Sequence, residues 1–303
     1  MLPPREFVRS QEASGRTYTS GEAQAYTRWL ATRHYENFHV ASIMLPRRLH
    51  QDFFNLYAFC RWADDLGDEM SSPAESERLL AWWGQELQGM YAGRVRHPVF
   101  VALQKTVDRH NLPIEPFQDL IRAFVQDQRV NRYRTFDELF AYCRWSANPV
   151  GRLVLYLCGY SDEERQRLSD ATCTALQLAN FWQDVSADLE KGRLYLPLEV
   201  LEKHGCTVDE IVERRATPAF LSAMREAVDV ARKLFREGLP LARTLNRRLA
   251  VDVELFSRGG MRILDKIEAQ RFDVLSRRPS VSRSERAWLL VTAVARAAFA
   301  KAA

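Results

Sequence analysis

The chain has 303 residues, of which 47% are hydrophobic and 27% are charged, as expected of a globular protein whose core can enclose a cavity. Its formal net charge of +4, from 43 basic and 39 acidic residues, is too small and too dispersed to indicate a nucleic-acid partner. The five cysteines form no C-x-x-C pair, and we expect free thiols in a reducing cytoplasm. No apolar run approaches the roughly 20 residues that cross a bilayer. The apolar stretch Trp288–Ala300 is too short to span but could contact the inner face of a membrane peripherally.

Helical periodicity dominates the chain and predicts an all-α fold in a single domain over 1–303, with a flexible segment 1–18. Most prolines fall at predicted helix starts or connections, but Pro149 lies inside a helical stretch and should break it. The predicted helices cover residues 20–34, 47–65, 75–91, 96–110, 114–127, 135–158, 161–189, 197–204, 217–237, 240–275 and 283–300.

A first acidic cluster appears in the segment YAFCRWADDLGDE, residues 57–69. At about 100° per residue, Tyr57, Arg61, Asp64 and Asp68 fall within a sector of about 60° on one helix face. The surrounding positions are apolar, and buried acidic residues rarely lack a partner or a metal. The alternative is an exposed acidic helix end, which is a common feature of soluble proteins.

A second cluster lies in QLANFWQDVSADLEKGRLYLP, residues 177–197. Here Gln177, Asn180, Asp184 and Asp188 share a sector of about 80° by the same helical arithmetic. The remaining positions of this helix are mostly apolar, so a polar stripe runs along an otherwise buried element.

Basic residues follow the second cluster, with Lys191 and Arg193 on either side of Gly192. Two helices that each present Asp at i and i+4 beside basic residues suit the departure of a diphosphate. Carboxylate oxygens bind Mg²⁺, and Mg²⁺ with Arg or Lys stabilises the charge that develops on the leaving group. We expect the segment Lys191–Tyr195 to close over the diphosphate; the alternative is an ordinary connection between helices.

The two segments resemble the squalene/phytoene synthase family, and the likeness extends from about His34 to about Leu275. The resemblance implies an all-α isoprenoid-synthase helical bundle around a central cavity. It also implies Mg²⁺ bridging the two aspartate clusters, which should face each other across that cavity, and prenyl diphosphate substrates.

Residue roles follow from the resemblance by matching positions. The implied metal ligands are Asp64, Asp65, Asp68, Asp184 and Asp188. The implied substrate-binding residues are His34, Asn37, Phe38, Arg61, Asn180, Lys191, Arg193 and Arg258. The residues implied to line the reacting end are Tyr57, Tyr142 and Gln177.

Within the family, three segments resemble the bacterial hydroxysqualene synthases of the squalene and hopanoid pathway: ENFHVAS (36–42), SANPVGRLVLYL (146–157) and LFSRGGMRILDKIEAQRFDVL (255–275). Such an enzyme ionises presqualene diphosphate, opens its cyclopropane and lets water capture the cation. It would act beside a presqualene diphosphate synthase and a flavoenzyme that reduces hydroxysqualene. It needs no reductant, so NADPH is not expected.

The sequence also departs from the commoner family pattern. Gln183 stands where many relatives carry Arg, which removes one diphosphate contact, and Asn37 replaces Ser. Ser146 and Asn148 replace apolar or small residues, and Gly260 falls where several relatives have tyrosine. We expect Ser146 and Asn148 to hold the capturing water, with space left by Gly260. The alternative for Asn148 is a helix cap before Pro149.

Other functions remain open on the sequence alone. The same fold could condense two prenyl diphosphates as a presqualene diphosphate, dehydrosqualene, squalene or phytoene synthase. A non-catalytic helical assembly factor of the same fold is an alternative of another class, although both aspartate pairs are whole here.

Overall fold

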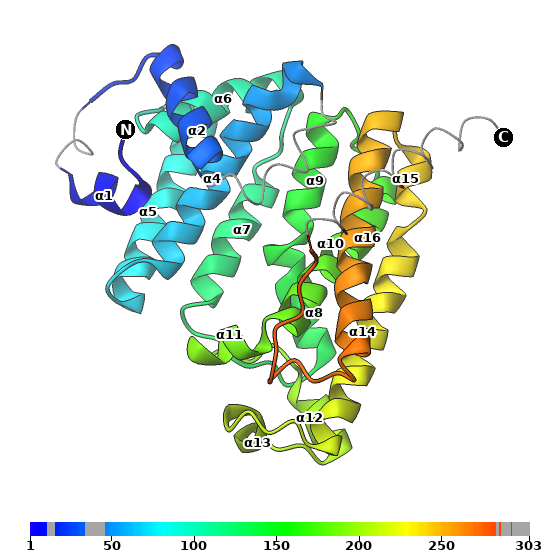
Figure 1. Ribbon diagram of the computed structural model, residues 1–303. Helices are drawn as coiled ribbons and strands as arrows, with labels where there is room; N and C mark the ends of the chain where they lie inside the picture. The colour runs from blue at the N-terminus through cyan, green and yellow to red at the C-terminus, as the bar shows by residue number, and fades with distance from the viewer. Residues whose placement is uncertain (11–15, 34–45, 283–284, 286–291, 293–303) are drawn as a thin grey trace. The chain divides into compact units, whose positions relative to one another are not determined.

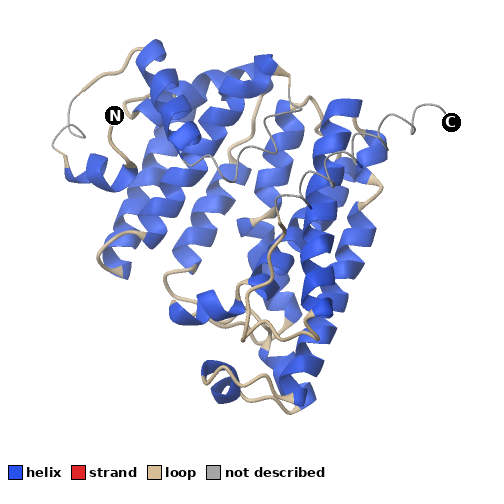
Figure 2. Cartoon of the chain, viewed as in Figure 1, coloured by secondary structure: helices blue, strands red, loops and turns tan. Residues whose placement is uncertain are grey.

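The computed structural model describes the whole chain except residues 11–15, 34–45, 283–284, 286–291 and 293–303. The described residues form helices joined by loops, and no strand occurs among them, as the ribbon of Figure 1 and the colouring of Figure 2 show. The predicted all-α fold is therefore confirmed. In the part of the chain that is described, no helix is long and apolar enough to cross a membrane.

The chain forms two compact units, of which the first comprises Met1–Arg129 and Arg152–Ser161 and the second the remaining residues. Helix α9, Asn148–Leu157, contributes residues to both units. The single domain expected from the sequence stays a prediction.

The first unit is built around helix α4, which contacts each of the helices α1, α2, α5, α6 and α7 (Figure 1). Its elements are α1 (Pro4–Arg9), α2 (Ser20–Arg33), the 3₁₀ turn η2 (Arg47–Leu49), α4 (His50–Asp68), α5 (Pro73–Tyr91), α6 (Pro98–His110) and α7 (Glu115–Gln126). Although the first 18 residues were expected to be flexible, α1 is helical and its Phe7 is buried against the rings of Tyr26 and Trp62.

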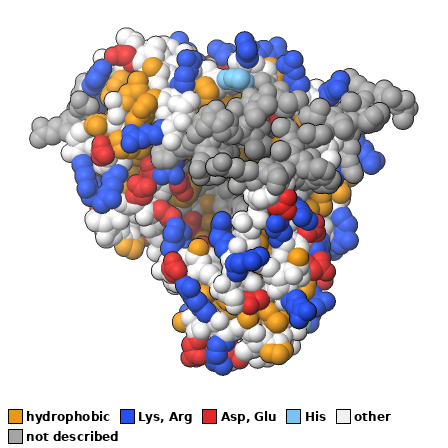
Figure 3. Space-filling view, in the orientation of Figure 1, with side chains coloured by type: hydrophobic (Ala, Val, Ile, Leu, Met, Phe, Trp, Pro, Cys, Tyr) orange, Lys and Arg blue, Asp and Glu red, His pale blue; other side chains and the backbone are white. Residues whose placement is uncertain are grey.

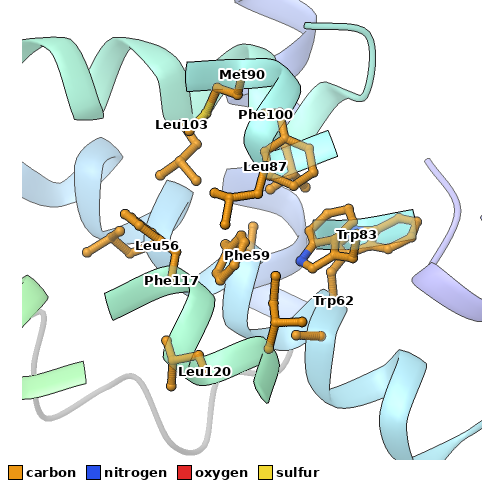
Figure 4. Packing of buried hydrophobic residues seen from close by; sticks show 14 of the residues in the cluster. Leu56, Phe59, Trp62, Trp83, Leu87, Met90, Phe100, Leu103, Phe117 and Leu120 are labelled. Atoms are coloured by element: carbon orange, nitrogen blue, oxygen red, sulfur yellow. The ribbon is translucent and has the colours of Figure 1, made fainter. Parts of the chain in front are cut away.

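An aromatic core fills the first unit between α4, α5 and α6 (Figure 4). The rings of Trp62 and Trp83 stack with centroids 5.0 Å apart, and Phe59 packs beside Trp83. The ring centroids of the buried His97 and Trp62 lie 4.3 Å apart with the rings at 80°, and burial lowers the pKa of His97 to about 3, so the imidazole is neutral. These rings fix α4 by apolar contact along most of its length.

A buried hydrogen-bond network joins α4 to α2 and α6. The amide of Asn55 accepts a hydrogen bond from Thr27 Oγ1 at 2.7 Å and donates to the Ala102 carbonyl and to Thr106 Oγ1. Thr106 in turn donates to the buried carboxylate of Asp52. Because each partner is satisfied, the network fixes the rotation of α4 about its own axis.

The second unit is built around helix α10, which contacts α8, α14, α15 and α16. Its elements are α8 (Phe136–Ser146), α10 (Glu163–Gln183), α11 (Val185–Glu190), α12 (Leu198–His204), α13 (Val208–Val212), α14 (Pro218–Gly238), α15 (Leu241–Thr244) and α16 (Arg247–Ala269). Polar N-caps begin several of these helices; Thr135, Asp162 and Thr217 each accept a backbone N–H from their helix.

Three glycines allow neighbouring helices to approach α10 closely. A Cβ at Gly238 of α14 would clash with Thr172, and one at Gly151 of α9 would clash with Ser169 and Cys173. A Cβ at Gly260 of α16 would clash with the ring of Phe235 and with Leu176 of α10. Backbone proximity, in addition to side-chain packing, therefore sets the position of α10.

Three predicted helices are divided in the structure. The predicted helix 135–158 ends at Ser146 and resumes at Asn148, as the proline at 149 predicts. The predicted helix 161–189 is interrupted at Asp184, whose φ of −106° and ψ of 12° leave the helical region. The predicted helix 240–275 separates into α15 and α16 and ends at Ala269.

Candidate active site

The first aspartate cluster lies at the C-terminal end of α4, the central helix of the first unit. Asp64 is half-buried and Asp68 is exposed. The guanidinium of Arg61 lies 3.2 Å from Asp64 and also forms ion pairs with Asp65 and Glu69. One arginine thus serves several carboxylates, and this end of α4 keeps an excess of acidic groups that favours a cation nearby.

Asp65 differs from its neighbours because its side chain is only 3% exposed. Burial raises the pKa of Asp65 to about 7, and the Arg61 guanidinium opposes that rise. The sequence implied that Asp65 assists in metal binding. Its burial beside Arg61 favours a role in holding that arginine in place.

Tyr57 lies on α4 one turn before Arg61 and is half-buried. Burial raises the pKa of the Tyr57 hydroxyl, so this group is protonated at neutral pH. The structure thus places Tyr57, Arg61, Asp64 and Asp68 along one helix, as predicted from their spacing.

The second aspartate cluster lies at the C-terminal end of α10 and in α11. The backbone N–H of Asp184 donates to the Asn180 carbonyl at 2.9 Å, and that of Asp188 donates to the Asp184 carbonyl at 2.8 Å. The i to i+4 spacing therefore survives the interruption at Asp184, so Asn180, Asp184 and Asp188 follow one another at helical intervals. Asn180 is exposed, whereas Asp184, Asp188 and Gln177 are half-buried.

An arginine that sequence reasoning missed pairs with Asp184. The guanidinium of Arg278 donates to both carboxylate oxygens of Asp184, with Nη2 lying 3.2 Å from Oδ2. These hydrogen bonds raise the pKa of Arg278 further above its usual range. In the sequence Arg278 stands beside Arg277, and such a basic pair is typical of a solvated helix face.

The connection after the second cluster is held at several points. Gly192 adopts a φ of +72°, and the backbone N–H of Arg193 donates to the Asp188 carbonyl at 2.9 Å. Leu194 pairs with the segment 131–132, and the ring of Tyr195 stacks on Phe181 at 3.7 Å. The second half of the segment predicted to move is therefore packed, and closure would involve the turn at Lys191 and Gly192.

Tyr142 belongs to the same aromatic stack. Its buried ring lies 6.1 Å from that of Tyr195 and 5.4 Å from that of Tyr133, counted between centroids. The stack brings Tyr142 close to the loop that carries Lys191 and Arg193, within the second unit.

The junction between α8 and α9 carries the two residues predicted to hold water. The Ser146 hydroxyl oxygen is buried and has no hydrogen-bond partner in the described part of the chain. Asn148 is also buried, but its Oδ1 accepts a hydrogen bond from Thr174 Oγ1 of α10 at 2.9 Å. Asn148 therefore links α9 to α10 through a hydrogen bond. Of the two residues, Ser146 is the one whose hydroxyl could still bind a water molecule.

The space expected at Gly260 is not there. Gly260 is buried, and a side chain at this position would overlap Phe235 and Leu176, so the expectation that Gly260 leaves room where relatives have tyrosine is wrong. The neighbouring Gly259 has no described atom within 4 Å of an added Cβ. Arg258, expected to bind diphosphate, pairs with Glu254 one turn earlier on α16 at 2.7 Å.

Three predicted substrate-binding residues, His34, Asn37 and Phe38, lie outside the described residues. Among the residues described, no three His, Cys, Asp or Glu side chains converge as a complete metal site. The carboxylate oxygens of the two aspartate clusters are ligands of the kind that Mg²⁺ takes, together with water and substrate phosphates. Asp184 already has one cationic partner, the guanidinium of Arg278.

The fold is the all-α isoprenoid-synthase fold, as the similarity to solved structures reported below shows. The squalene/phytoene synthase family model matches residues 31–285, and the chain belongs to this family. Enzymes of the family are prenyltransferase-type synthases that act on prenyl diphosphates and typically use a divalent metal.

Individual relatives support the assignment. The chain is 33% identical to phytoene synthase of Thermus thermophilus, over 88% of this chain and 90% of that protein. It is 31% identical to phytoene synthase 3 of Zea mays over 86% of this chain, and it spans 63% of the length of the maize protein.

Solved structures of related synthases share the fold of this chain. The crystal structure of squalene synthase HpnC from Alicyclobacillus acidocaldarius is similar with a TM-score of 0.80 and 46% identity, over 82% of this chain and 94% of that chain. A dehydrosqualene synthase in complex with ligand shares the fold, with a TM-score of 0.80 and 24% identity over 91% of this chain and 97% of that chain.

Proposed function

We propose that this chain converts presqualene diphosphate to hydroxysqualene and diphosphate in the presence of Mg²⁺. The observation that carries the proposal is the 46% identity with a squalene synthase, compared with 31% and 33% for two phytoene synthases. The segments that resemble hydroxysqualene synthases, at residues 146–157 and 255–275, support the same branch of the family.

The reaction balances without a reductant. The carbon–oxygen bond to diphosphate breaks, the resulting cyclopropylcarbinyl cation rearranges and opens to an allylic cation, and a water oxygen forms the new carbon–oxygen bond. The water loses one proton to the departing diphosphate or to solvent. Substrate and product are lipids, which favours a peripheral contact with a membrane, and the chemistry requires a synthase that supplies presqualene diphosphate and a reductase that consumes the alcohol.

The two aspartate clusters would hold the metal. Asp64 and Asp68 on α4 and Asp184 and Asp188 on α10–α11 offer carboxylate oxygens at one-turn spacing. Bound Mg²⁺ neutralises negative charge on the leaving diphosphate. The basic residues that would bind the diphosphate oxygens are Arg61, Lys191, Arg193 and Arg258.

Ser146 is our candidate for holding the capturing water. A buried water needs two to four polar partners, and the buried Ser146 hydroxyl has no partner among the described residues. Asn148 is a weaker candidate than the sequence indicated, because its carbonyl oxygen already accepts a hydrogen bond from Thr174.

A second candidate function is the head-to-head condensation of two prenyl diphosphates. The 33% identity with phytoene synthase over 88% of the chain favours it. Complete condensation to a hydrocarbon would consume two molecules of farnesyl or geranylgeranyl diphosphate and release diphosphate from each molecule.

One experiment separates the two functions. The purified protein is incubated with presqualene, farnesyl or geranylgeranyl diphosphate, with and without Mg²⁺ and NADPH, and the extracted lipids are identified by mass spectrometry. Hydroxysqualene formed from presqualene diphosphate with Mg²⁺ alone is the expected product. Products formed only from farnesyl or geranylgeranyl diphosphate would replace this proposal by the condensation. The Asp184→Asn variant controls for contaminating activity.

A further inference from the structure

The segment that follows α16, residues 271–280, is held against α10 and α11; we call it the C-terminal strap. The side-chain amide of Gln183 donates to the Pro279 carbonyl at 2.7 Å. The Ser186 hydroxyl lies 3.0 Å from the Val274 carbonyl and 3.1 Å from that of Leu275. These contacts come from the residue before Asp184 and from the second residue after it, so the strap is attached on both sides of that carboxylate.

The strap is built into the core of the second unit and is not a loose loop. Val274, Leu275 and Pro279 are buried, as is the amide of Gln183. Phe272, the second residue of the strap, has a φ of +67°, and the guanidinium of Arg225 lies over its ring at 4.7 Å. The packing therefore leaves little freedom for the backbone on either side of Arg278.

This packing places the exposed side chain of Arg278 against Asp184. Its side chain is 55% exposed and that of Asp184 is 29% exposed. Solvent-exposed ion pairs contribute little stability, so a divalent cation can replace the guanidinium at modest cost. Gln183, which the sequence suggested had removed a basic contact, instead anchors the strap that supplies one.

We propose that Arg278 is a standing counter-ion of Asp184, which a divalent cation displaces, and that Gln183 is the positioning residue that keeps Arg278 there. The inference rests on the proposed function, because it takes Asp184 as a metal ligand. Mg²⁺ and Arg278 then compete for the same carboxylate oxygens. The strap keeps the displaced guanidinium within reach of the metal, where an anionic ligand of that metal would meet it.

The test is the Mg²⁺ affinity of the substrate-free protein, measured by titration calorimetry at constant ionic strength. Arg278→Met should bind Mg²⁺ about two- to fivefold more tightly than the unaltered protein, because an exposed ion pair of this kind no longer competes. Arg277→Met is the matched control: it removes one positive charge from the adjacent exposed position and should leave the affinity unchanged.

The role of Gln183 is tested by a double-mutant cycle. Gln183→Leu removes the hydrogen bond to Pro279, the residue after Arg278, and should raise the Mg²⁺ affinity towards that of Arg278→Met, and the double variant should gain nothing further. If Gln183 acted only by stabilising the fold, the effects of the two substitutions on Mg²⁺ affinity would add. Additive effects would therefore overturn the positioning role of Gln183.

A direct readout is the Nε–H resonance of Arg278 in ¹⁵N NMR spectra, assigned by its absence from Arg278→Met. Saturating Mg²⁺ should shift this resonance and speed its exchange with water, because the hydrogen bond to Asp184 is lost. A resonance that Mg²⁺ leaves unchanged would overturn the displacement.

Asp184→Asn separates the failure of this inference from the failure of the proposed function. If Asp184→Asn weakens Mg²⁺ binding while Arg278→Met leaves the affinity unchanged, the counter-ion role is wrong and the metal ligand stands. If Asp184→Asn has no effect on Mg²⁺ binding, the proposed metal site itself is wrong.

Discussion

Asp252 on α16 should make the stability of the protein fall as the pH rises. Its side chain is buried, and among the described residues neither carboxylate oxygen has a hydrogen-bond partner. Burial raises the pKa of Asp252 from 3.8 to about 8. The native carboxyl therefore keeps its proton over a range in which the unfolded chain has already released it.

The sign and the size of the effect follow from proton linkage. Between about pH 4 and pH 8 the native state binds one proton more than the unfolded state at this position, so the free energy of unfolding decreases with rising pH across that window. Each pKa unit corresponds to about 1.4 kcal/mol, so the loss approaches roughly 6 kcal/mol once the pH exceeds the native pKa. Below about pH 4 the group contributes no pH dependence.

The assay is urea denaturation between pH 5 and pH 9, comparing the unaltered protein with Asp252→Asn, whose amide imitates the neutral carboxyl. The variant should be more stable than the unaltered protein above pH 8, and their difference should shrink as the pH falls. Exposed Asp265 on the same helix provides a matched control in Asp265→Asn. Parallel stability profiles for the unaltered protein and Asp252→Asn would refute the reasoning.

Three further predictions concern the metal, the water and the core. Asp68→Asn and Asp184→Asn should each lower the rate of diphosphate release about a hundredfold or more, since each removes charge that holds the metal. The exposed Asp209→Asn on α13 should retain the normal rate, and near-normal release by either folded site variant would exclude the role. Ser146→Val should shift the products, read by mass spectrometry, from hydroxysqualene to hydrocarbons formed by proton loss, whereas Ser146→Thr should retain the alcohol; unchanged product ratios would contradict the water-holding role. Asn55→Leu should lower the free energy of unfolding by roughly 2 to 4 kcal/mol in urea denaturation, because the hydroxyl and carbonyl groups that it bonds lose their partners; a loss below 1 kcal/mol would show that these partners find others.

Most of the helical architecture could be predicted because apolar periodicity and proline positions act locally. The interruption before Pro149 was predictable, since proline removes an N–H and crowds the preceding turn. The interruption at Asp184 was not, because neither proline nor glycine lies near it. Helix α13 was also missed; with five residues, it is too short to show a period.

The aspartate pairs could be predicted because i and i+4 positions share a helix face whatever the tertiary structure. Arg278 could not be paired with Asp184, since 94 residues separate them and only the path of the strap brings them together. The space predicted at Gly260 was wrong for a similar reason: Phe235 comes from another helix, and its ring fills that position.

The three glycines that face α10 are positions where a substitution should reduce activity although no polar group is lost. Gly151, Gly238 and Gly260 carry no chemistry, yet any side chain at these positions must displace a helix or one of its neighbours. Because α10 ends at Gln183, directly before Asp184, a displacement of the helix several turns away moves that carboxylate. A genetic screen for loss of activity should therefore recover substitutions at these glycines alongside those at the aspartates. The two groups should differ in that the glycine variants lose activity more steeply at high growth temperature.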